Sequence, residues 1–108
     1  MDFQLALDTV YKGLEVVNLI RPVEDAISPA PDVTLTGEGG SLDSLALITM
    51  ALAIERRVDE TTGQQISLLG DSDFESQLQA FRTPSTIAGL ILEKLANDQD
   101  IRRLGLQR

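Results

Sequence analysis

The stretch Gly39-Gly40-Ser41-Leu42-Asp43-Ser44-Leu45 constrains the fold of this chain more than any other segment. Two glycines end a segment with scattered prolines, and an Asp-Ser pair then begins a strongly apolar run that continues to Val58. Asp and Ser favour helix starts because their side-chain oxygens accept hydrogen bonds from the unpaired N–H groups of the first turn. The pattern therefore predicts a helix over 43–58. It leaves open whether Asp43 or Ser44 is the cap.

The position of Ser44 has a second interpretation besides helix capping. A serine in the first turn, directly behind a glycine pair, is expected to be exposed to solvent. The same place is the positive end of the helix dipole, which favours a phosphate group by about 0.3–1 kcal/mol. The local chemistry therefore suits a phosphodiester on Ser44, and the alternative is that Asp43-Ser44 only starts the helix.

Leu42-Asp43-Ser44-Leu45, followed by an apolar helix, resembles the phosphopantetheine attachment motif of the acyl carrier protein family. The similarity covers roughly residues 3–95 and is weak outside the motif and its helix. The resemblance implies that Ser44 carries a covalent 4′-phosphopantetheine group derived from coenzyme A, with Asp43 and Leu45 as its motif neighbours. The thiol of that group holds acyl or aminoacyl intermediates as thioesters. A carrier of this kind is not an enzyme, and no catalytic residue or metal site is expected.

The resemblance also implies partners. They are a phosphopantetheinyl transferase and the acyl-loading and acyl-processing enzymes of a fatty-acid, polyketide or related pathway. In fatty-acid carriers the corresponding helix is rich in acidic residues that meet basic patches on synthase enzymes. Here Glu55 is followed directly by Arg56-Arg57, which indicates a dedicated pathway with partners of its own. We expect a monomer in the cytoplasm.

The apolar spacing predicts an all-α fold, an acyl-carrier-protein-like bundle of three main helices and one short helix. The main helices are expected near 3–20, 43–58 and 84–96, the short one near 72–81, with a long loop between the first two main helices. The chain is expected to be a single carrier domain over 1–108, with a tail from about residue 97. The inward-facing residues of the first and last helices are predicted to be Phe3, Leu7, Val10, Leu14 and Val17, and Ile87, Leu90, Ile91 and Leu95.

The second helix carries two apolar rows. One consists of Leu45, Ile48 and Leu52, and the other of Leu47, Ala51, Ile54 and Val58. So broad an apolar surface must pack on more than one neighbour or leave part of its face for a partner. We expect core positions that also line an acyl chain at Leu45, Ile48, Leu52, Ile66 and Ile87. In the loops, the expected anchors to the core are Val33, Leu35, Leu68 and Leu69.

Composition excludes several classes of function. The net charge of −8 disfavours binding to nucleic acid or to anionic membranes. Without Cys or His the chain can form no disulfide, no Cys/His zinc site and no Ser-His-Asp triad. Asp71, Asp73 and Glu75 resemble the start of a calcium loop but lack its glycine and final glutamate. No signal peptide or spanning run of roughly 20 apolar residues is visible. The alternative to a carrier is a small helical protein–protein interaction module without a prosthetic group.

Overall fold

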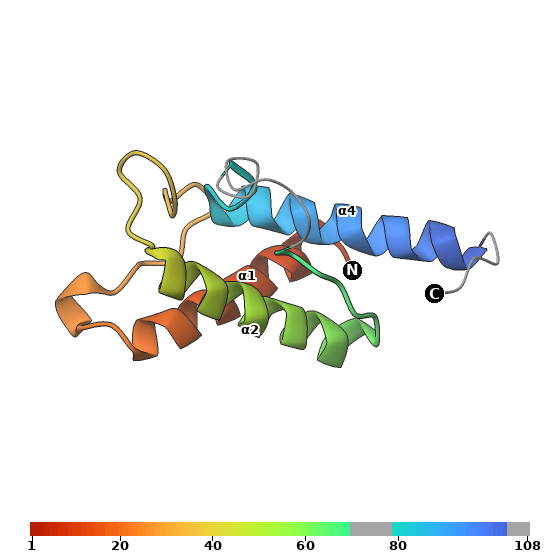
Figure 1. The fold of residues 1–108 in the computed structure, drawn as a ribbon, viewed down its shortest axis with the longest axis horizontal. Helices are drawn as coiled ribbons and strands as arrows, with labels where there is room; N and C mark the ends of the chain where they lie inside the picture. The colour runs from red at the N-terminus through yellow and green to blue at the C-terminus, as the bar shows by residue number, and fades with distance from the viewer. Residues whose placement is uncertain (70–78, 104–108) are drawn as a thin grey trace.

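The computed structural model describes residues 1–69 and 79–103, with side chains as far as Ala96. Within these residues the protein is helical and contains no strand (Figure 1). The elements are α1 (Phe3–Leu19), a short 3-10 helix η1 (Val23–Asp25), α2 (Ser44–Thr62) and α4 (Pro84–Arg103). The predicted all-helical class and the three main helices are therefore confirmed for the described part of the chain.

The three long helices run lengthwise through the fold (Figure 1). Helix α1 runs in the opposite direction to α2 and α4 and packs against both of them. Their shared core is aliphatic, apart from Phe81 and the sulfur of Met50. The residues of α1 and α4 predicted to face inward are buried at Leu7, Val10, Leu14, Val17, Ile87, Ile91 and Leu95. Two of the predicted residues differ: Leu90 is only partly buried, and Phe3, in the first turn of α1, is about half exposed.

Side-chain caps fix where the helices begin. The Asp2 carboxylate accepts a hydrogen bond from the backbone N–H of Leu5 at 2.8 Å, which starts α1. At α4, Thr83 and Thr86 pair reciprocally, with each backbone N–H donating to the hydroxyl of the other residue at 3.0 and 3.2 Å. Pro84 is the first helical residue, where its missing N–H removes no intrahelical bond.

Two helices end later than the sequence predicts. Helix α2 continues through Thr62 and ends at Gly63, which adopts φ 74° and donates its N–H to Asp59 at 2.8 Å. A glycine in this left-handed conformation is a common helix stop, because it carries no Cβ to clash. Helix α4 continues to Arg103 and extends beyond the ends of α1 and α2 (Figure 1). From Leu90 to Arg103 no glycine or proline interrupts it.

The short helix predicted near 72–81 lies mostly outside the described residues. Its end is described, with Gln79 and Ala80 helical and Phe81 in the turn that follows. Phe81 is completely buried. The candidate calcium-loop residues Asp71, Asp73 and Glu75 lie outside the described part of the chain.

Candidate functional site

Ser44 is the first residue of α2, and Asp43 is the cap of that helix. The Asp43 Oδ1 atom accepts from the backbone N–H of Ala46 at 2.8 Å, and its carbonyl accepts from the N–H of Leu47 at 2.9 Å. The helix start predicted from the sequence is confirmed, and Asp43 rather than Ser44 is its cap. Ser44 is exposed, and within the described residues its hydroxyl bonds to no other protein group.

The residues after Ser44 fix the orientation of the site. Ala46 and Leu47 are buried in the core, whereas Leu45 is 69% exposed. The first turn of α2 is thus held on its inner side, while Asp43, Ser44 and Leu45 all face solvent. The three residues predicted for prosthetic-group attachment therefore lie together on one accessible helix end.

The loop before α2 is attached to the rest of the fold by backbone hydrogen bonds. The N–H of Leu35 donates to the carbonyl of Arg82 at 2.7 Å, and the N–H of Leu42 donates to the carbonyl of Leu35 at 3.0 Å. Leu35 is fully buried, which confirms it as an anchor, while Val33 is only partly buried against the core. This chain of contacts connects the residue before Asp43 to the start of α4.

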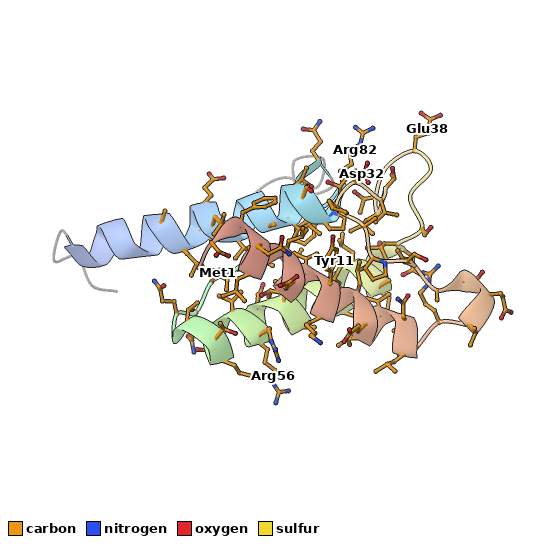
Figure 2. All side chains as sticks on the ribbon, turned by 180° about the vertical axis from the view of Figure 1, so that it is seen from behind. Met1, Tyr11, Asp32, Glu38, Arg56 and Arg82 are labelled. Atoms are coloured by element: carbon orange, nitrogen blue, oxygen red, sulfur yellow. The ribbon has the colours of Figure 1, made fainter. Side chains whose placement is uncertain are left out.

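Between Leu35 and Leu42 the chain folds back on itself through three glycines. Gly37 and Gly39 have φ of 80° and 81°, a region that other residues rarely occupy. Gly40 packs so tightly that a Cβ atom there would lie 2.7 Å from the carbonyl oxygen of Leu35. Glu38 lies at the outer tip of this loop (Figure 2). The turn that places Asp43 at the start of α2 therefore requires glycine at these positions.

Arg21 connects the end of α1 to the same loop. Its Nε atom donates to the carbonyl of Asp25 at 3.0 Å, and its Nη1 atom donates to the carbonyl of Ser41 at 3.2 Å. Ser41 lies three residues before Ser44, so this guanidinium holds both ends of the long loop. The sequence alone does not indicate this role of Arg21, because backbone carbonyl partners leave no pattern in the residue types.

The five residues predicted to lie in the core and line an acyl chain do not come together. Ile87 is fully buried, whereas Leu45, Ile48 and Leu52 are 69%, 45% and 57% exposed. Those three predicted core positions are wrong, because neither α1 nor α4 covers that row of α2. Leu52 and Ile66 do share the lining of a shallow hollow of ≈ 360 Å³, together with charged residues such as Glu55 and Asp59.

Glu55 has a structural role that the sequence did not indicate. Its Oε2 atom accepts from the backbone N–H of Leu68 at 2.9 Å, which ties the segment after α2 back to that helix. Leu68 is buried as predicted, while Ile66 and Leu69 are partly buried. Glu55 is half-buried at this contact.

Other kinds of site find no support in the described residues. No group of three or more His, Cys, Asp or Glu side chains is placed there to hold a metal ion. Nor does any helix in the described ranges combine the length and apolar character needed to cross a membrane. Burial, followed by the charges of Asp8 and Asp32, raises the pKa of the Tyr11 phenol above its ordinary value.

Comparisons of the chain with protein-family models, with curated proteins and with solved structures gave no match.

Proposed function

We propose that this chain is a carrier protein whose Ser44 is modified with 4′-phosphopantetheine from coenzyme A. The observation that supports this most is the exposed, unpaired Ser44 hydroxyl on the first residue of a well-capped helix. When attached, the group supplies a thiol that carries acyl or aminoacyl intermediates as thioesters. The chain itself performs no bond chemistry in this function and presents the intermediate to separate enzymes.

The residues around Ser44 fit a phosphodiester. The capping bond from Asp43 uses the N–H of Ala46, so the N–H groups of Ser44 and Leu45 remain without an intrahelical acceptor. Together with the helix dipole, these two donors favour an anion at the Ser44 side chain by about 0.3–1 kcal/mol. Asp43 stabilises the first turn of α2 as its cap, while Leu45 offers an exposed apolar contact beside the attachment point.

Several contacts keep the Ser44 region in place. Arg21 holds the carbonyl of Ser41, and the bond between Leu35 and Leu42 fixes the residue that precedes the cap. A transferase that must bring coenzyme A to one hydroxyl gains from an acceptor whose position is already defined. The loop is long, yet its attachment to α1 and to the start of α4 limits where Ser44 can lie.

A specific observation favours a second candidate function. Leu45, Ile48 and Leu52 form an exposed apolar row on α2, which suits contact with another protein. In a helical interaction module without a prosthetic group, Asp43-Ser44 would serve only as the helix start. In both functions the exposed apolar row of α2 contacts a partner protein. The two functions differ in whether Ser44 is modified.

The test is the intact mass of the protein after incubation with coenzyme A and a broad-specificity phosphopantetheinyl transferase. A carrier gains the mass of one phosphopantetheine group, and proteolytic mapping places that group on the peptide that contains Ser44. A protein that gains no mass with several transferases of different specificity, while remaining folded by circular dichroism, is an interaction module instead.

A further inference from the structure

A groove lies between α1 and α2, toward the second half of α2. It has a volume of ≈ 470 Å³, and its lining includes the apolar side chains of Val16 and Leu52. Lys12, Arg56 and Arg57 border it, along with Glu15 and Glu60. An apolar floor with a charged border is the usual composition of a protein-binding groove.

The charges around this groove are mostly paired, with a positive excess. Nζ of Lys12 lies 3.7 Å from Oε2 of Glu15, and Nε of Arg56 lies 3.2 Å from Oε1 of Glu60. Each acidic side chain of the groove therefore has a basic partner. Arg57 is in no ion pair with any residue in the described ranges. The groove lining therefore has three basic and two acidic side chains, an excess of one positive charge in a chain whose net charge is −8.

The groove continues into the exposed apolar row of α2. Leu45, Ile48, Leu52 and Arg56 follow one another at spacings of three and four residues, which places them along one side of the helix. At a rise of about 1.5 Å per residue this side is about 16 Å long, roughly three helical turns. An amphipathic helix has the matching shape, because its own apolar side chains recur at the same spacings.

We propose that the α1–α2 groove and the adjoining apolar row bind an amphipathic helix of a partner protein, with carboxylates that meet Arg56 and Arg57. Its apolar side chains cover Leu52, Ile48 and Val16, and its acidic turn meets the unpaired Arg57. This partner differs in charge from the basic surfaces that the family resemblance implies.

Charge favours this occupant over others. A nucleic acid or an anionic membrane is large enough to be repelled by the net negative charge of the whole chain, and the few basic side chains at the groove would not offset that repulsion. A second copy of the chain would bring a net charge of −8 against an equal one, which opposes association. Carboxylates that lie in a single turn of a partner helix can contact Arg56 and Arg57 directly.

The proposal does not depend on a prosthetic group at Ser44, and it is tested with the Ser44→Ala protein. The probes are two synthetic helical peptides of about 15 residues with the same leucine stripe, one with glutamates at its C-terminal turn and one with lysines there. Binding is followed by NMR titration of backbone amides. The glutamate peptide is expected to bind at least about tenfold more tightly at low salt, with the difference shrinking as salt rises. The shifts should concentrate on α2 and the facing part of α1.

Charge reversal provides the decisive variant. Arg56→Glu with Arg57→Glu should reverse the preference, so that the lysine peptide binds more tightly by about tenfold. The Arg56 side chain is 85% exposed and Arg57 is exposed, so the fold should survive, and the neutral pair Arg56→Gln with Arg57→Gln should abolish the preference. Arg82→Glu is the matched control, because Arg82 projects from the opposite side of the molecule (Figure 2). It should bind like the parent.

Several outcomes would overturn the proposal. They are equal affinity for both peptides, no binding of the glutamate peptide, a preference unchanged by charge reversal, or shifts located away from the groove. Concentration-dependent self-association that covers the same amides would assign the surface to a second copy instead. None of these outcomes bears on whether Ser44 is modified.

Discussion

Asn18 and Ile27 are joined by two hydrogen bonds of 2.9 Å, one in each direction. The Asn18 side-chain amide donates from Nδ2 to the carbonyl of Ile27, and its Oδ1 atom accepts from the Ile27 N–H. A side chain on α1 thus satisfies both backbone groups of a buried loop residue, as a neighbouring strand would. This pair and Arg21 together hold the long loop against the end of α1.

Replacing Asn18 with alanine should lower the free energy of unfolding by about 1–3 kcal/mol, because both backbone groups of Ile27 lose their partners in a partly buried site. Asn18→Asp is the sharper comparison. It retains an acceptor for the Ile27 N–H but places a carboxylate against the Ile27 carbonyl, so it should be at least as destabilising at neutral pH. Urea denaturation measures both variants, and midpoints equal to that of the parent would show that the loop is held in another way.

Leu52 and Ile87 should respond very differently to truncation. Ile87→Ala removes a fully buried side chain and should cost about 2–5 kcal/mol. Leu52→Ala removes a side chain that is 57% exposed, and it should stay within about 0.5–1 kcal/mol of the parent. The two variants are compared in the same denaturation experiment. A loss at Leu52 as large as that at Ile87 would mean that another element covers the α2 row.

Two glycines offer a test of how closely α1 and α2 pack. A Cβ at Gly13 would lie 2.8 Å from Cγ1 of the buried Ile54, whereas a Cβ at Gly89 in α4 meets nothing within 4 Å. Gly89→Ala should stabilise by about 0.5–1 kcal/mol through helix propensity. Gly13→Ala gains the same propensity but overpacks the interface, which costs about 1–3 kcal/mol. Free energies of unfolding that rise equally in both variants would argue against the close contact.

The sequence predicted the helices well because their signals are local. Asp43 before an apolar run and Pro84 after a threonine identify helix starts, and both starts lie where those residues indicate. The late end of α2 also has a local signal, because Gly63 is a residue type that commonly stops a helix in the left-handed conformation.

Which side of a helix is covered by other helices could not be predicted from the sequence in the same way. The spacing of Leu45, Ile48 and Leu52 shows that they share a side of a helix, but it does not show whether another helix lies over that side. Arg21 and Glu55 bind backbone groups far along the chain, at Ser41 and Leu68. Such contacts depend on the path of a loop, and no residue pattern records that path.

Alkaline pH should weaken the fold through Tyr11. Burial, followed by the charges of Asp8 and Asp32, raises the pKa of the Tyr11 phenol above 10.0. The folded protein therefore binds this proton more tightly than the unfolded chain does. Its contribution to stability is complete below the unfolded pKa of about 10 and is lost as the pH rises through the folded value. Tyr11→Phe should show a shallower decline in unfolding free energy across this range, and an unchanged slope would assign the decline to other groups.

Modification of Ser44 distinguishes a carrier protein from a module without a prosthetic group, and Ser41 provides the matched control. Both serines are exposed, but Ser41 lies in the loop, whereas Ser44 begins α2. Asp43 is the cap, so Ser44→Ala should remain folded, which circular dichroism verifies. The measurement is intact mass after incubation with coenzyme A and transferase. We expect one phosphopantetheine on the parent and on Ser41→Ala, and none on Ser44→Ala. A parent that stays unmodified, or a Ser44→Ala protein that still gains the group, would contradict this expectation.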